Sequence, residues 1–99
     1  MRAHTHPAIE NVALEDIFHA LSDPVRLDIV RRLARDGEAN CAALECGRPK
    51  SSMSHHFRVL RDCGLIHTRI EGVTHLNALR KKELDGRFPG LLKAVLAAG

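Results

Sequence analysis

Residues 50–66 read KSSMSHHFRVLRDCGLI, and the two halves of this stretch differ in character. The first half is polar and rich in hydroxyl and imidazole side chains. Apolar residues recur every three or four positions from Met53 to Leu60, and Gly64 is suited to the position that follows a helix. We therefore expect an amphipathic helix over 50–63 whose N-terminal half presents a polar, basic face.

Three further helices are predicted before this stretch. The apolar residues of 10–21 recur at helical spacing. Asp23 can cap a second helix over 24–35, and Asn40 can cap a short third helix over 41–46. Glycine and proline residues between these segments end one helix and open the next.

After Gly64 the helical spacing gives way to two extended segments, LIHTRI and VTHLNAL. The Glu-Gly pair at 71–72 lies between them, which predicts a β-hairpin with a tight turn. A helical turn over 81–88 and a last helix over 89–98 are expected to follow.

The third and fourth helices, joined by a short turn that contains glycine, form a helix-turn-helix pattern, and a hairpin directly after it adds a wing. We therefore predict a single domain over 1–99 that is mainly α with a small β-hairpin, a winged helix-turn-helix with the order α-α-α-α-β-β-α. Residues 1–8 are expected to be flexible.

Composition narrows the class of protein. The chain has 99 residues, of which 44% are hydrophobic and 27% charged, as in ordinary globular domains. No apolar run approaches the roughly 18 residues of a membrane span, and the first residues lack the apolar core of a secretory signal. Three cysteines without a disulfide spacing suit a reducing compartment. We expect a cytoplasmic protein with no membrane partner.

Charge is distributed unevenly along the chain. Eight cationic and two anionic side chains lie between Arg48 and Lys82, so this segment carries +6, while the rest carries −3 and the whole chain +3. A basic segment of this kind is expected where a protein presents one face to a polyanion. The sequence therefore predicts double-stranded DNA as the partner, although a solvated surface with chance clustering gives the same count.

The polar residues of the fourth helix are candidate DNA contacts because the N-terminal half of a recognition helix enters the major groove. Hydroxyl groups suit base edges or phosphates, and arginines further along suit phosphates. The hairpin tip is expected to contact DNA as the wing. The predicted DNA-binding residues are Lys50, Ser51, Ser52, Ser54, His55, Arg58, Arg61, Arg69 and Thr74.

Three stretches resemble the arsenical-resistance-repressor (ArsR) family of winged-helix regulators: LSDPVRLDIVRRL at 21–33, SSMSHHFRVLRDCGLI at 51–66 and RIEG at 69–72. The resemblance implies a homodimer built from the first and last helices (9–21 and 89–98), a palindromic operator, and repression that an effector relieves. An apolar excess on those two helices fits such a seam independently. The predicted interface residues are Ile9, Val12, Ile17, Leu91, Leu92 and Val95.

Metal sites that the resemblance implies are not matched here. The family's Cys-x-Cys pair falls on Asn40 and Ala42, with Cys41 between them, and the last helix contains no histidine. We therefore predict no metal and no cofactor. His4 and His6 suit adventitious metal binding better than sensing. His67 and His75 are candidates to face each other across the wing, with an ordinary paired strand position as the simpler interpretation.

Two alternatives stay open at this point. Cys41, Cys46 or Cys63 can form a thiol or redox switch if a thiolate is accessible, although small core residues are the commoner fate of free cysteines. A winged helix can also bind proteins, which requires an apolar recognition face. An enzyme is not expected, because the sequence has no phosphate-binding glycine loop, nucleophile elbow or recognisable carboxylate pair. The effector, whether a small molecule or an oxidant, is not identified by any residue.

Overall fold

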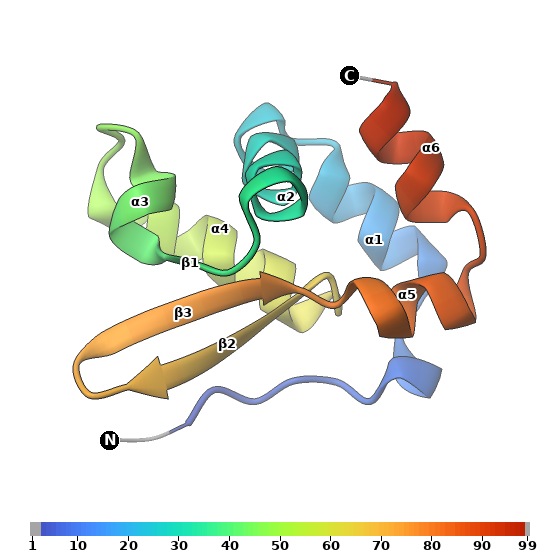
Figure 1. Ribbon diagram of the computed structural model, residues 1–99, viewed down its shortest axis with the longest axis horizontal. Helices are drawn as coiled ribbons and strands as arrows, with labels where there is room; N and C mark the ends of the chain where they lie inside the picture. Colours follow the sequence, from blue (N-terminus) through green and yellow to red (C-terminus); the bar gives the residue numbers. More distant parts are fainter. Residues whose placement is uncertain (1–2, 99) are drawn as a thin grey trace.

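The computed structural model describes residues 3–98, and the elements follow the predicted order with two additions (Figure 1). The helices are η1 (Ile9–Asn11, a 3₁₀ turn), α1 (Leu14–Leu21), α2 (Pro24–Asp36), α3 (Cys41–Glu45), α4 (Lys50–Asp62), α5 (Lys81–Arg87) and α6 (Leu91–Ala97). The strands are β1 (Ala39–Asn40), β2 (Ile66–Glu71) and β3 (Thr74–Leu79), in the antiparallel order β1-β3-β2. The predicted winged helix-turn-helix is confirmed, while the two-residue β1 and the early 3₁₀ turn were not predicted.

Side-chain caps set where the helices begin. The backbone N–H groups of Val25 and Arg26 donate to Asp23 Oδ1 at 2.8 and 3.3 Å, and Pro24 occupies the first helical position. The N–H of Ala43 donates to Asn40 Oδ1 at 2.8 Å and so opens α3. Both caps were predicted from the sequence.

The hairpin turns one residue later than predicted. Glu71 pairs with Thr74, so Gly72 and Val73 form the turn in place of Glu71 and Gly72. Gly72 has φ +62°, and a glycine at the first central position of a two-residue turn allows the chain to reverse with the twist of the strands. The position of Gly72 therefore sets the register in which β2 pairs with β3.

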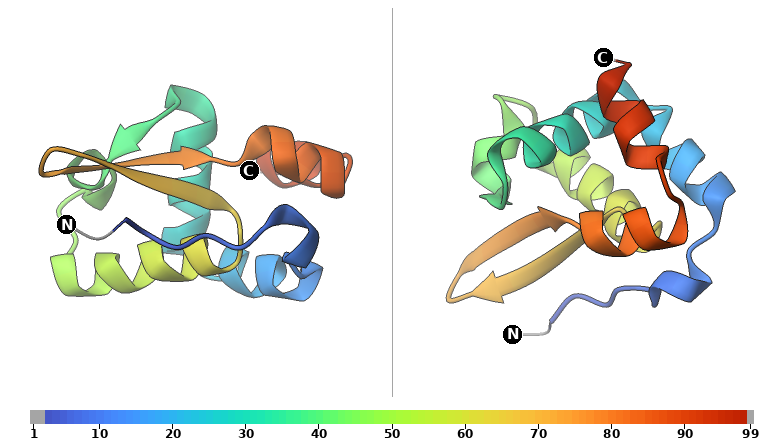
Figure 2. Two further views of the ribbon diagram at one scale, coloured as in Figure 1. Left: turned by 90° about the horizontal axis from the view of Figure 1, so that it is seen from below. Right: turned by 45° about the vertical axis from the view of Figure 1, so that its right-hand side comes forward.

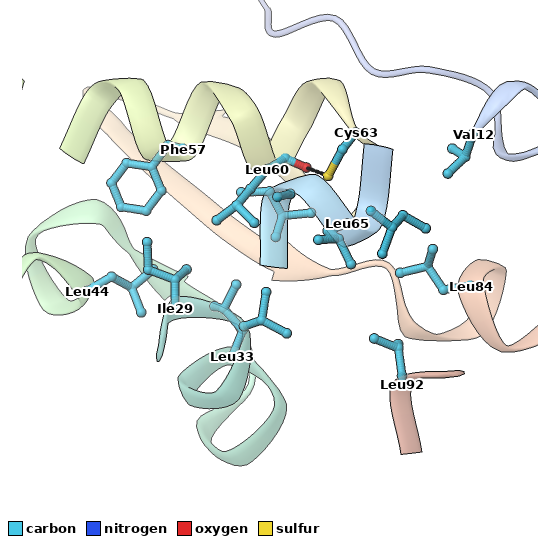
Figure 3. Packing of buried hydrophobic residues seen from close by; sticks show 14 of the residues in the cluster. Val12, Ile29, Leu33, Leu44, Phe57, Leu60, Cys63, Leu65, Leu84 and Leu92 are labelled. Atoms are coloured by element: carbon cyan, nitrogen blue, oxygen red, sulfur yellow. Dashed lines mark hydrogen bonds between the residues drawn. The ribbon is translucent and has the colours of Figure 1, made fainter. Parts of the chain in front are cut away.

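The core is aliphatic and lies between α1, α2, α4, the hairpin and the two C-terminal helices (Figure 3). Its fully buried members include Ile17, Ile29, Met53, Leu60, Leu65, Ile66, Leu84 and Leu92. α4 contributes one buried face to this core, which leaves its other face free.

The first helix is shorter than predicted. It begins at Leu14, because the chain is extended at Val12 and the Val12 side chain turns into the core. Val12 packs directly against the backbone of Gly64: a Cβ on Gly64 would lie 2.4 Å from Val12 Cγ2. A continuous helix over 10–21 would withdraw this side chain from the core.

Three of the six predicted dimer-interface residues are buried within a single protomer. Val12, Ile17 and Leu92 are at most 3% exposed within a single protomer, because so small a chain needs them for its own core. Ile9, Leu91 and Val95 are partly exposed. The large apolar side chains that α1 presents to solvent are Leu14 and Phe18, which are 39% and 53% exposed.

The N-terminal arm, defined here as residues 3–8, runs in extended conformation beside β2 (Figures 1 and 2). The expected flexibility of residues 1–8 stays a prediction, and its first two residues lie outside the described range. No helix in the described part of the chain is long and apolar enough to cross a membrane.

Candidate nucleic-acid interface

The turn between α3 and α4 sets the angle at which α4 leaves the core. Cys46 and Gly47 both adopt left-handed backbone conformations, with φ +51° and +79°. Within residues 3–98, Cys46 is the one non-glycine residue with positive φ. Two left-handed residues in succession reverse the chain sharply, so that α4 starts on the outside of the molecule at Lys50.

α4 is held by its buried face and exposes the predicted polar face. Met53, Phe57 and Leu60 are buried, and Figure 3 shows Phe57 and Leu60 within the core. The side chains on the opposite face are exposed: Lys50, Ser51, Ser52, Ser54, His55 and Arg58. Ser52 Oγ donates to Pro49 O at 3.0 Å, so its proton is already used at the helix start. The remaining groups project from one helix at the spacing that a groove requires.

Arg61 and His56 lie differently from the exposed set. Arg61 is half-buried, and desolvation lowers the pKa of its guanidinium. The Arg26 guanidinium lies 3.3 Å from His56 Nδ1, and its Nε donates to Ala20 O at 2.7 Å. Arg26 is buried and connects the end of α1 to α4. This positioning role was not predicted from the sequence, where its one signal is an arginine three residues after the Asp23 cap.

Much of the predicted basic charge is neutralised inside the protomer. Arg80 binds Glu83 through two contacts of 3.0 Å, Lys81 binds Asp85 at 2.6 Å, and Arg48 lies 3.6 Å from Asp28. Arg58 lies 3.7 Å from Asp62 in an exposed pair, which contributes little to stability. Among residues 3–98 no ion pair is recorded for Lys50.

The wing arginine is also paired. Arg69 donates to both carboxylate oxygens of Glu38, at 3.0 and 2.8 Å, and to Glu71 at 2.5 Å. These two carboxylates raise the pKa of the Arg69 guanidinium. Thr74, the other predicted wing contact, is half-buried, and Val73 at the tip is 88% exposed. Arg69 must exchange partners before it can bind a phosphate.

A buried polar network connects the wing to α3. Thr68 Oγ1 donates to Asn77 Oδ1 at 2.7 Å, and Asn77 Nδ2 donates to Ala39 O at 3.3 Å and to Cys41 Sγ at 3.4 Å. Thr68 and Asn77 are almost fully buried. Because each donor has a partner, the network fixes the wing relative to the first helix of the helix-turn-helix.

The three cysteines differ in accessibility. Cys63 is buried, its Sγ donates to Leu60 O at 3.3 Å, and burial raises its pKa to about 11 (Figure 3). Cys41 is half-buried and Cys46 is exposed. A thiolate is the reactive form of cysteine, so Cys63 is poorly suited to a redox switch.

The histidines of the wing pair with the N-terminal arm and do not face each other. In the hairpin register His67 lies opposite Ala78 and His75 opposite Ile70, which overturns the idea of a His67–His75 pair. His4 contacts His75, and His6 stacks on His67. Within residues 3–98, no group of three or more His, Cys, Asp or Glu side chains is arranged to hold a metal ion.

Comparison with known proteins identifies proteins that are similar to this chain. Residues 21–69 match the family model described as a helix-turn-helix domain. The chain is 38% identical over 82 residues to the uncharacterized HTH-type transcriptional regulator YceK of Bacillus subtilis, covering 80% of this chain and 82% of that protein. It is 36% identical over 73 residues to the arsenical resistance operon repressor of Staphylococcus xylosus, covering 73% and 70%.

A solved structure agrees with these relatives. The crystal structure of an ArsR family transcriptional regulator superposes with a TM-score of 0.68 at 31% identity, covering 86% of this chain and 89% of that one. These similar proteins are transcriptional regulators and not enzymes. With its winged helix-turn-helix and these relatives, the chain belongs to the ArsR family of helix-turn-helix transcriptional regulators.

Proposed function

We propose that the protein is a homodimeric, cytoplasmic repressor that binds a palindromic DNA operator through α4. The observation that carries this proposal is the division of α4 into a buried face, with Met53, Phe57 and Leu60, and an exposed polar face that starts at Lys50. Ser51, Ser54 and His55 on that face supply donors and acceptors for base edges. Arg58 lies one turn further along, where phosphates are reached.

The wing contributes in a different way. Arg69 reaches DNA only by exchanging Glu38 and Glu71 for phosphate, so the wing adds sequence-independent affinity. Val73 at the tip offers an apolar contact to sugar or to a groove wall. Thr74 and the half-buried Arg61 are supporting contacts within this proposal.

Dimerisation is proposed through α1 and α6. Leu14 and Phe18 expose apolar surface whose burial in an interface is favourable. Further apolar side chains on η1 and α6 are partly exposed: Ile9, Leu91 and Val95. Two copies related by a two-fold axis would place two α4 helices on successive major grooves. The relative named as an arsenical resistance repressor supports repression as the outcome.

The two alternatives are less well supported. A protein-interaction module requires an apolar recognition face, whereas the exposed face of α4 is polar. A thiol switch would have to use Cys41 and Cys46, since Cys63 is buried with a raised pKa. An effector, if it acts, must bind two conformations of the dimer unequally.

Hydroxyl-radical footprinting on the DNA upstream of the protein's own gene tests the proposal. We expect two protected patches on one face of the duplex, about 10 base pairs apart. A single protected patch would contradict the proposed homodimer. Uniform weak protection along the whole fragment would contradict sequence-specific binding.

A further inference from the structure

The N-terminal arm runs beside the wing (Figures 1 and 2), and two pairs of histidines hold it there. His4 Nε2 lies 2.8 Å from His75 Nδ1 on β3. The ring of His6 stacks on that of His67 on β2, with centroids 4.1 Å apart and planes inclined by 19°. Each histidine of the arm therefore contacts one strand of the hairpin.

In the closed arm His6 accepts a hydrogen bond, which excludes a proton on its Nε2 atom. The backbone N–H of Thr68 donates to His6 Nε2 at 2.9 Å, so this nitrogen must carry a lone pair. A proton on Nε2 would direct two N–H groups at each other. The His4–His75 contact is more tolerant, because one extra proton still leaves one nitrogen to donate and the other to accept.

The surroundings of His6 oppose a positive charge. Four groups with cationic or titratable nitrogens face it: His67 on β2, Arg80 after β3, Arg61 on α4 and His4 on the arm. Burial, followed by these groups, lowers the pKa of His6 to about 4. Arg80 is held in place, because it binds Glu83 and its Nη1 donates to Pro7 O at 2.8 Å.

His4 is affected in the same direction. Burial lowers its pKa, and the charges of Arg61 and His75 act in the same sense.

We propose that the N-terminal arm is an acid-released strap, closed on the edge of the wing while His6 is neutral and released when His6 takes up a proton. In the released arm His6 has its ordinary pKa of 6.5. The ratio of closed to open arm is therefore constant well above pH 6.5. It falls by up to about tenfold per pH unit below that value for each proton taken up.

Release exposes the outer edge of β2, since β2 is the last strand in the order β1-β3-β2. The proton also adds positive charge to the released arm. An effect of the strap on DNA affinity rests on the proposed function, whereas the strap itself does not.

NMR of the uniformly ¹⁵N-labelled full chain without DNA, with EDTA present, tests the strap. Heteronuclear NOE values of arm amides and the Thr68 amide shift are followed from pH 7.5 to 5.5. We expect an ordered arm at pH 7.5 and a fall of up to about tenfold in the closed-to-open ratio between pH 6.5 and 5.5. The amide signals of Ile29 and Val30 in α2 report whether the domain stays folded.

Three variants sharpen the test. His6→Gln keeps an acceptor for Thr68 that does not titrate, so the arm should stay ordered at pH 5.5. His6→Ala should release the arm at both pH values. His19→Gln, at an exposed histidine on α1, is the matched control and should respond as the unmodified chain does. An equal closed-to-open ratio at pH 7.5 and pH 5.5 in the unmodified chain would overturn the proposal, as would a fall of the same size in His6→Gln.

DNA titrations of the unmodified chain and His6→Gln at both pH values form a separate experiment. If the strap proposal is wrong, the NMR measurements on the DNA-free protein show it. If the proposed function is wrong, only the titrations show it, as an absence of DNA binding.

Discussion

At the scale of single residues, the exposed side chains of α4 differ in whether they are free to bind. Lys50 and Ser54 are exposed at its N-terminal half, whereas Ser52 already donates to Pro49 O. Lys50→Ala and Ser54→Ala should each weaken binding to the specific duplex by about 1–3 kcal/mol, if each contacts a base edge. Fluorescence anisotropy measures this loss.

Ser22→Ala is the matched control for Ser54→Ala, because Ser22 lies between α1 and α2 and its hydroxyl donates to His19 O. Its effect on DNA affinity should be negligible. An equal loss for Ser22 and Ser54 would contradict the assignment of Ser54 to a base edge.

The cysteines give a second prediction at this scale. At pH 8 Cys46 should react first with a thiol reagent, because it is exposed. Cys63 should react only as fast as the protein unfolds, because it is buried and its pKa of about 11 keeps it protonated. Mass spectrometry of partially labelled protein gives the order. Early labelling of Cys63 in folded protein would reopen its role as a sensor.

Residue-scale contacts were predictable only where they are local. The helical period identifies the polar face of α4, and the caps at Asp23 and Asn40 follow from short-range sequence. The contact between Arg69 and Glu38 does not follow from it, because the two residues are 31 positions apart in the chain. Charge counting along the sequence therefore overestimates the free positive charge of the surface.

At the scale of elements, the close approach of η1 to the end of α4 is decided by one glycine. Gly64 has φ +91°, and an added Cβ would lie 2.4 Å from Val12 Cγ2. Gly64→Ala should lower the free energy of unfolding by about 2–4 kcal/mol, from overpacking and backbone strain together. Urea denaturation followed by circular dichroism measures the change.

Gly86→Ala is the matched control, since Gly86 lies in α5 and nothing lies within 4 Å of an added Cβ. It should raise the free energy of unfolding by about 0.5–1 kcal/mol. Similar destabilisation in both variants would contradict the packing of Val12 on Gly64.

The wing is the second element whose behaviour is testable. Glu38→Gln removes one carboxylate from Arg69 and leaves Glu71. Sequence-independent DNA binding should strengthen, and the slope of log affinity against log salt should steepen by about one. Glu10→Gln makes the same charge change in η1, away from the wing. Equal effects of the two variants would mean that net charge alone is responsible.

Elements whose apolar residues recur at a clear helical or strand spacing were predicted, and elements without such a spacing were not. β1 has two residues, too few for alternation to appear, and it exists because it pairs with Asn77 and Leu76 of β3. The first helix was predicted too long because residues 10–13 have apolar spacing, yet Val12 is needed in the core at an angle that a helix does not allow.

At the scale of the whole molecule, the proposed repressor requires two copies of the chain. The sequence indicates an apolar surplus on the terminal helices but cannot divide it between core and interface. Three of the six predicted interface residues turned out to be buried. Leu14 and Phe18 are the exposed apolar side chains of α1 that the proposed interface has to cover.

Phe18→Ser should therefore shift the protein toward the monomer, because it removes apolar surface from the interface. Sedimentation equilibrium should give about twice the 11.0 kDa chain mass for the unmodified protein and a lower mass for the variant. Val73→Ser removes an apolar side chain that is even more exposed, at the wing tip, and should stay dimeric. A monomeric unmodified protein, or a dimeric Phe18→Ser, would contradict this interface.

Sequence-specific DNA binding is tested by an anisotropy titration of the reduced protein with its own upstream duplex and with a scrambled duplex of equal composition. Both titrations are run at the same stated salt concentration, because salt changes both affinities. We predict binding to the upstream duplex that is tighter by about 10³-fold or more. Equal, weak binding to the two duplexes would contradict sequence-specific regulation and favour the protein-interaction module.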